Sequence, residues 1–161
     1  MEQKKKHVLA FRLIKERFLD TPLSSEGVRR WGGRWNPPGI GILYTSSEPS
    51  LTVLEQLVHL PTLPYEDLPR LWLLTIRLPQ PPRLLLADQL PPDWNQEYDF
   101  SANYACLSPW LEQPDVLAIG VPSAVIRQSV NYLIHPLHPA FSSVEVIGAE
   151  RFQIDRRLWK P

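Results

Sequence analysis

The stretch RRWGGRWNPPGIGILYTS, residues 29–46, decides how the rest of this sequence is interpreted. Two tryptophans, Trp31 and Trp35, bracket a Gly-Gly-Arg turn that presents Arg34. Glycine adopts backbone conformations that other residues avoid, so this turn gives the chain unusual freedom where a guanidinium is presented. The apolar run that follows predicts a strand over 41–46. The stretch therefore predicts a flexible, positively charged corner walled by aromatic rings.

The composition is that of an ordinary soluble globular protein. The chain has 161 residues, 43% of them hydrophobic and 21% charged, with a formal net charge of zero. That length suits a single domain over residues 1–161, and a neutral chain argues against a broad nucleic-acid-binding face. The lone Cys106 rules out an internal disulfide and suits a reducing compartment. Because we find neither a signal peptide nor an apolar run of roughly 20 residues, we expect a cytoplasmic protein without membrane segments.

Outside the opening stretch, apolar segments separated by prolines predict an α+β fold. The 18 prolines cluster between apolar runs, where they end elements. Several predicted strands follow one another without a helix between them, which favours a mixed or antiparallel sheet with flanking helices. One helix is expected to have Ser46 and Ser47 as caps, and another to end before Pro109. The expected strands are 7–14, 41–46, 70–78, 83–87, 115–123, 131–136 and 144–155, and the expected helices are 48–60 and 101–112.

Glu55 is the first candidate for chemistry. On an ideal helix Leu51, Leu54 and Val58 share an apolar face, and Glu55 lies at its edge. A carboxylate beside a buried stripe either reaches solvent as a rim residue or has a partner or a function. From periodicity alone, both interpretations stay open. Similarly, Arg34 is a surface or ion-pair residue as readily as a ligand contact, and Tyr44 is by default a core or rim aromatic.

Arg34, Tyr44 and Glu55 follow one another at spacings of ten and eleven residues, and this arrangement resembles the RES domain family, named for its arginine, glutamate and serine. The matching motifs are Gly32-Gly33-Arg34-Trp35-Asn36, a following glycine at 39 or 41, Tyr44-Thr45-Ser46, Glu55, VPSAV at 121–125 and NYLIHPLHP at 131–139. The resemblance extends from about Phe11 to Phe152. The sequence departs from the family pattern at His135, which replaces an asparagine, and at Leu107-Ser108, where the family often carries Gly-Asp.

The resemblance implies a fold similar to that of ADP-ribosyltransferases and a toxin of a toxin–antitoxin system that destroys NAD. The implied reaction cleaves the bond between nicotinamide and ribose, with phosphate or water as acceptor. NAD would be the substrate and inorganic phosphate the co-substrate, with no cofactor and no metal. The implied partners are a helix-turn-helix antitoxin and a second copy of the chain, with no direct binding of nucleic acid.

The family match also implies catalytic roles for three of the residues. Glu55 would stabilise the ribosyl cation that forms when nicotinamide leaves. Arg34 would clamp the pyrophosphate with bidentate hydrogen bonds that a lysine does not reproduce. Tyr44 would offer a ring face to nicotinamide and a hydroxyl to orient it. Trp31 and Trp35 either wall this corner or are structural.

The remaining site residues are expected to bind rather than to react. Ser123 would bind a phosphate or a ribose through its hydroxyl, and it is a poor candidate nucleophile because no base lies beside it in sequence. Arg12 is a second candidate ligand contact in the first strand. Asn131 either contacts substrate or ties down a loop, with the loop favoured. We interpret His135 and His138 as structural, since no cysteine or acidic cluster completes a metal-site spacing.

Two other functions remain compatible with these residues. An ADP-ribosyltransferase would pass the same ribosyl cation to a protein target. A catalytically silent module would use the pocket to hold a nucleotide or an antitoxin tail. The first would leave a labelled acceptor protein, and the second would leave NAD intact.

Overall fold

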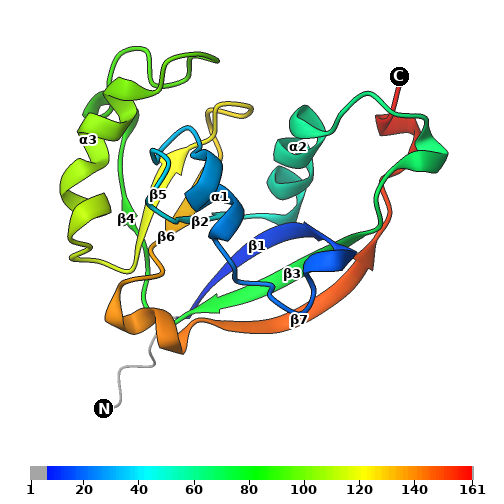
Figure 1. The fold of residues 1–161 in the computed structure, drawn as a ribbon, viewed down its shortest axis with the longest axis horizontal. Helices are drawn as coiled ribbons and strands as arrows, with labels where there is room; N and C mark the ends of the chain where they lie inside the picture. The colour runs from blue at the N-terminus through cyan, green and yellow to red at the C-terminus, as the bar shows by residue number, and fades with distance from the viewer. Residues whose placement is uncertain (1–6, 161) are drawn as a thin grey trace.

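The chain folds around one mixed β-sheet flanked by helices, in a computed structural model that describes residues 7–160 (Figure 1). Seven strands of the described residues form this sheet in the order β4-β5-β6-β2-β1-β3-β7. Neighbouring strands are antiparallel except for β4 and β5, which are parallel. The predicted α+β class with a mixed sheet is therefore confirmed.

The bounds of the elements follow the alternation of apolar runs and prolines along the chain. The strands are β1 Val8–Lys15, β2 Leu43–Ser46, β3 Leu71–Leu78, β4 Arg83–Leu84, β5 Ala118–Pro122, β6 Val130–Ile134 and β7 Glu145–Phe152. The helices are α1 Glu26–Trp31, α2 Pro49–His59 and α3 Ser101–Glu112. Short 3-10 turns are η1 Glu16–Phe18, η2 Tyr65–Asp67, η3 Ala87–Gln89, η4 Pro139–Ser143 and η5 Arg156–Leu158.

The sheet consists of two halves that meet at a narrow seam between β1 and β2. Strand β1 pairs with β3 along its whole length, from Val8 opposite Leu78 to Lys15 opposite Leu71. Strand β2 likewise pairs with β6 along its whole length. By contrast, the register between β1 and β2 in the described chain contains the single pair Phe11–Ser46. The two halves of the sheet therefore share little backbone pairing where they meet.

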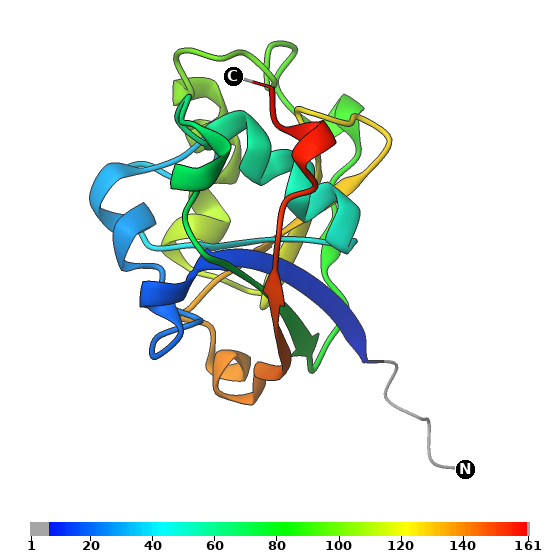
Figure 2. The same cartoon turned by 90° about the vertical axis from the view of Figure 1, so that its right-hand side faces the viewer.

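Two helices cover different halves of the sheet. Helix α3 packs Leu107, Trp110 and Leu111 against apolar side chains of β5 and β6. Helix α2 packs against the other half, where Val53 and Leu57 contact a cluster with residues of β1 and β3. Figure 1 shows α3 beside β4 and β5, and α2 above β1; the rotated view of Figure 2 again has α2 above β1. The seam therefore lies beside α2.

Several sequence-based boundaries were wrong for identifiable reasons. Helix α3 does not end before Pro109 but continues through it. The proline removes the N–H that would bond to the carbonyl of Ala105, and the Ser108 hydroxyl donates to that carbonyl instead, at 3.2 Å. Strand 83–87 ends early because Leu86 begins a 3-10 turn, in which its N–H donates to the Gln89 side chain at 2.8 Å.

The start of helix α2 also differs from the expectation. Pro49 occupies the first turn as predicted, but the N-cap residue is Glu48 rather than Ser46 or Ser47. The Ser46 hydroxyl instead donates to Asn131 across the strands. Helix α1 was not predicted, because its six residues bury none of their side chains and so leave no apolar periodicity. Within residues 7–160, no helix combines the length and apolar character needed to cross a membrane.

Candidate functional site

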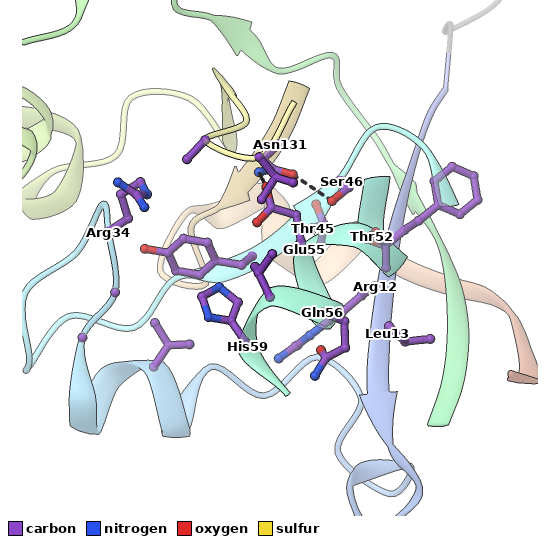
Figure 3. Close-up of a pocket in the computed structure, with 18 of the residues that line it drawn as sticks. Arg12, Leu13, Arg34, Thr45, Ser46, Thr52, Glu55, Gln56, His59 and Asn131 are labelled. Atoms are coloured by element: carbon purple, nitrogen blue, oxygen red, sulfur yellow. Dashed lines mark hydrogen bonds between the residues drawn. The ribbon is translucent and has the colours of Figure 1, made fainter. Parts of the chain in front are cut away.

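A cavity of about 500 Å³ opens over the seam of the sheet. Strands β1 and β2, helix α2 and the turn of Gly32, Gly33 and Arg34 contribute its walls. Figure 3 shows Arg34 at the left of the labelled side chains and Arg12 on the other side of Glu55, beside Gln56. The lining residues among those predicted from the sequence are Arg12, Arg34, Tyr44, Glu55 and Asn131.

Glu55 is held in the cavity wall by one of its two carboxylate oxygens. Its Oε1 accepts a hydrogen bond from the Ser123 hydroxyl at 2.7 Å and another from the Asn131 amide at 2.6 Å. Among residues 7–160, none donates a hydrogen bond to Oε2. Every buried side-chain oxygen and nitrogen of the described residues has a partner, so Oε2 is accessible from the cavity. Glu55 is therefore a fixed carboxylate with one free oxygen, rather than a rim residue extended into solvent.

Ser123 supports Glu55 instead of lining the cavity. Its side chain is fully buried, and its oxygen accepts the N–H groups of Val125 and Ile126, both at 3.0 Å. With both acceptor positions occupied, the hydroxyl proton points to Glu55. The expected binding of phosphate or ribose by Ser123 therefore requires this hydroxyl to leave its present partners.

Asn131 lies in the cavity wall and bonds on both sides of its amide. Its nitrogen donates to Glu55 at 2.6 Å, and its oxygen accepts the Ser46 hydroxyl at 2.8 Å. Asn131 and Ser46 are also opposite each other in the β2–β6 register. Of the two predicted roles, the tether describes these contacts best, but the tether holds the candidate catalytic side chain rather than a loop.

Arg34 lines the cavity while its guanidinium holds a neighbouring loop. Its Nη1 donates to the carbonyl of Trp94 at 3.2 Å and to that of Gln96. The guanidinium carbon lies 5.0 Å from the centre of the Phe100 ring, within the range of a cation–π contact. Burial lowers the pKa of Arg34, and the negative charge of Glu55 opposes this effect. Arg34 therefore acts on the electrostatics of the cavity and on the position of the loop.

The hydroxyl of Tyr44 belongs to the glycine turn. It donates to the Asn36 side chain at 2.7 Å and accepts the backbone N–H of Trp35 at 3.0 Å. Burial raises the pKa of Tyr44 well above its ordinary value. A Cβ on Gly33 would lie 2.8 Å from the Tyr44 hydroxyl, so the close approach requires glycine at this position. The ring of Tyr44 lines the cavity, whereas its hydroxyl fixes the turn that carries Arg34.

The two tryptophans of the opening stretch do not wall the cavity. Trp31 is 79% exposed at the end of α1. Trp35 is only 3% exposed and stacks on Trp94 in the core, with 5.9 Å between ring centres. Of the two interpretations of these residues, the aromatic wall is wrong. Phe11, Tyr44 and Phe100 supply the aromatic side chains of the lining instead.

Arg12 extends from β1 to the loop before α1. Its guanidinium donates to the carbonyls of Pro22 at 3.1 Å and Ser24 at 3.2 Å. Burial lowers the pKa of Arg12 to about 10. Arg12 thus adds a second positive charge to the cavity wall, from strand β1.

The departures from the family pattern lie away from the cavity lining. His135 is fully buried, with Nε2 2.9 Å from the Leu111 carbonyl and Nδ1 accepting the Leu137 N–H at 3.2 Å. His138 accepts the Ala140 N–H at 3.0 Å. The structural interpretation of both histidines is confirmed. Leu107 is a core residue facing β5 and β6, so these departures do not alter the walls around Glu55.

Sequence reasoning missed a polar face of α2. Thr52, Gln56 and His59 line the cavity together with Glu55. These positions follow the spacing i, i+3, i+4, i+7, which places them on one face of the helix. A search for polar as well as apolar periodicity would have found them. Within residues 7–160, no group of three or more His, Cys, Asp or Glu side chains is placed to hold a metal ion.

Comparison with known proteins identifies a matching family model and similar curated proteins. The family model described as "RES domain" matches residues 9–155. "Toxin Res" of Photorhabdus laumondii is 30% identical over 155 residues, covering 95% of this chain and 98% of that protein. The "Prs ADP-ribosylating toxin" of Sphingobium is 28% identical over 142 residues, covering 84% and 86% of the two chains.

A solved structure also resembles the fold. It is the crystal structure of the M. tuberculosis MbcT–MbcA toxin–antitoxin complex, with a TM-score of 0.70, 19% identity, and coverage of 92% of this chain and 86% of that chain. At this identity the likeness shows only that the two proteins share a fold.

Proposed function

Because this chain belongs to the RES domain family, we propose that residues 1–161 form a single-domain toxin of a toxin–antitoxin system that cleaves NAD between nicotinamide and ribose. The names of the relatives support the class of protein, and one of them is named for ADP-ribosylation. The observation that carries the proposal is the state of Glu55, whose Oε1 is anchored and whose Oε2 is accessible from the cavity.

Cleavage of the nicotinamide–ribose bond leaves positive charge on the ribose. The transition state resembles an oxocarbenium ion, as in other glycoside cleavages. A fixed carboxylate oxygen stabilises such a charge without reorganising at the moment of reaction. Glu55 meets this requirement because two neutral donors, Ser123 and Asn131, hold it without cancelling its charge. Oε2 then faces the developing cation or a ribose hydroxyl.

In this scheme Arg34 and Arg12 supply the positive charge that attracts the pyrophosphate of NAD, and Arg34 also has donors available for it. Among the described residues, the contacts of the Arg34 guanidinium with carbonyls all use Nη1. Its Nη2 and Nε remain as donors for a phosphate oxygen, and bonds of this charged kind are the strong ones. The ring of Tyr44 is the flat surface for nicotinamide in this scheme.

The acceptor is proposed to be inorganic phosphate. Glu55 is the only carboxylate side chain among the described residues that line the cavity, and it is assigned to the cation. Phosphate is already an anion at neutral pH, so it needs positive charge rather than a base. Water requires a base, and His59 on the polar face of α2 is the candidate for that role. The two acceptors would therefore give different products from the same site: ADP-ribose-1″-phosphate with phosphate and ADP-ribose with water.

The test is incubation of purified protein with NAD, with and without phosphate, and separation of the products by mass. We expect NAD consumption to rise with phosphate concentration and to yield ADP-ribose-1″-phosphate. A rate independent of phosphate, with ADP-ribose as the product, would exclude phosphate as acceptor and leave NAD hydrolysis.

The matched variant for the proposed chemistry is Glu55→Gln. The glutamine oxygen can accept the same two hydrogen bonds, so the fold should persist while the charge is lost. Removal of one such electrostatic contact costs on the order of 10²–10³ in rate. A folded Glu55→Gln protein that consumes NAD at the parental rate would contradict the assignment of Glu55.

A second candidate function is ADP-ribosylation of a protein, favoured by the Sphingobium relative's name. Labelled NAD in the same assay distinguishes the candidates, because a transferase leaves label on an acceptor protein. Intact NAD after incubation would instead indicate a binding module without catalysis. The solved neighbour is a toxin–antitoxin complex, and on this basis we also propose that this chain pairs with an antitoxin. From the family resemblance we further propose that the antitoxin is of helix-turn-helix type and that the chain is cytoplasmic and forms a homodimer.

A further inference from the structure

Ser46 lies at the seam of the sheet and bonds to the group that holds Glu55. It is the last residue of β2, and in the registers it is opposite Asn131 on one side and Phe11 of β1 on the other. Its side chain is 4% exposed. Its hydroxyl donates to the Asn131 oxygen at 2.8 Å, which leaves the Asn131 nitrogen to donate to Glu55 at 2.6 Å.

The direction of these hydrogen bonds is the reason Ser46 matters. An asparagine amide presents an acceptor on one side and donors on the other. If the amide of Asn131 turned over, its oxygen would face the carboxylate, and two acceptors would oppose each other. The carboxylate thus selects the observed orientation, and the Ser46 hydroxyl donates to the amide oxygen on the far side, so that the amide is held between two partners. Among residues 7–160, Ser46 is the only side chain that donates to the Asn131 oxygen, so without it the amide would be anchored at one end only.

We propose that Ser46 is a positioning residue for the reaction, and that it acts by fixing the amide of Asn131 so that this amide anchors Oε1 of Glu55. The proposal rests on the function proposed above. It connects the seam of the sheet to the chemistry, because Ser46, which pairs with Phe11 of β1, also holds the amide that anchors the carboxylate. Ser46 itself does not touch the reacting atoms.

The kinetic test compares Ser46→Ala, Asn131→Ala and the double variant in NAD consumption. We expect Ser46→Ala to lower kcat about tenfold, the factor equivalent to one hydrogen bond, with little change in KM. Because Ser46 acts through Asn131, the double variant should be no slower than Asn131→Ala alone. Additive losses in the double variant would overturn the proposal.

A matched control separates positioning from general loss of a hydroxyl. Tyr65→Phe removes a hydroxyl that donates to the Ile154 carbonyl at 2.6 Å, at the rim of a different pocket. It should leave kcat unchanged even where it lowers stability. Ser46→Thr restores a hydroxyl and should recover part of the rate. A parental rate in folded Ser46→Ala, while Glu55→Gln is slow, would refute the role of Ser46 without touching the proposed function.

A readout independent of activity keeps the proposal testable if NAD is not the substrate. In an NMR spectrum of the parental protein, the two Asn131 side-chain amide protons should have well-separated resonances, because one of them is bonded to a carboxylate. Ser46→Ala should reduce that separation, and Tyr65→Phe should not. Unchanged Asn131 resonances in Ser46→Ala would show that the amide is oriented without Ser46.

Discussion

Replacement of Tyr44 by phenylalanine tests whether its hydroxyl belongs to the turn or to the chemistry. In the structure that hydroxyl bonds to Asn36 at 2.7 Å and to the N–H of Trp35 at 3.0 Å. Tyr44→Phe keeps the ring that lines the cavity and leaves both partners without a bond. Asn36 is fully buried and Trp35 is 3% exposed, so water reaches them poorly.

The cost follows from the number of groups left unpaired. Each buried donor or acceptor without a partner costs about 1–3 kcal/mol, and two such groups give about 3 kcal/mol after some local rearrangement. In a chain of this length that loss lowers Tm by roughly 10 °C. Activity should change less than stability, because the ring and the Glu55 carboxylate remain. We expect kcat for NAD within about threefold of the parental value at a temperature where both proteins are folded.

Urea unfolding at constant temperature and steady-state NAD consumption measure the two quantities on the same preparations. Tyr132→Phe is the matched control, because within residues 7–160 the Tyr132 hydroxyl makes no hydrogen bond and its loss should leave stability almost unchanged. If Tyr44→Phe kept the parental stability and lost most of its kcat, the hydroxyl would act on the substrate and the structural assignment would be refuted.

Two further variants test the turn and the buried histidine. Gly33→Ala should lower both Tm and NAD consumption, because its Cβ would lie 2.8 Å from the Tyr44 hydroxyl, which two hydrogen bonds hold in place. The control Gly27→Ala places its Cβ in open space and should be neutral or slightly stabilising. Equal Tm values for the two variants would contradict this. Burial lowers the pKa of His135 in the folded protein, so the unfolded chain binds the proton first and stability should fall as pH drops below about 6.5. In urea unfolding at several pH values, His135→Asn should have a lower free energy of unfolding near pH 7, and that free energy should fall less as the pH drops. If it fell as steeply as in the parental protein, groups other than His135 would cause the pH dependence.

The arrangement of elements could be predicted from the sequence because it depends on local patterns. Apolar runs bounded by prolines located the strands, and the apolar face of 48–60 located α2. Where an expected boundary was wrong, as at Pro109, a nearby side chain bonds to the backbone group that the boundary residue leaves without a partner. Pro109 lies inside α3 because the Ser108 hydroxyl takes the orphaned carbonyl, and sequence rules for proline do not include that compensation.

The composition of the site was partly predictable, and the state of its atoms was not. Arg34, Tyr44 and Glu55 line one cavity as their order along the chain suggested. Which of their donors and acceptors are already engaged depends on contacts between distant segments, such as Ser123 with Glu55, 68 residues apart. The same limit explains the tryptophans: only Gly32, Gly33 and Arg34 separate Trp31 from Trp35, yet Trp31 faces solvent and Trp35 lies in the core.

The way Glu55 is held has a consequence for its charge. Ion pairs of the described chain, such as Arg29 with Glu26 and Arg83 with Asp115, bring each carboxylate within 3 Å of a guanidinium, at 2.6 Å and 2.7 Å. A partner of that kind would neutralise a catalytic carboxylate and reduce its attraction for a developing cation. Glu55 is fixed instead by a hydroxyl and an amide, which contribute direction without a full positive charge. Neutral groups therefore set the geometry of the carboxylate without a direct cationic partner, and this combination is what the proposed stabilisation of a ribosyl cation requires.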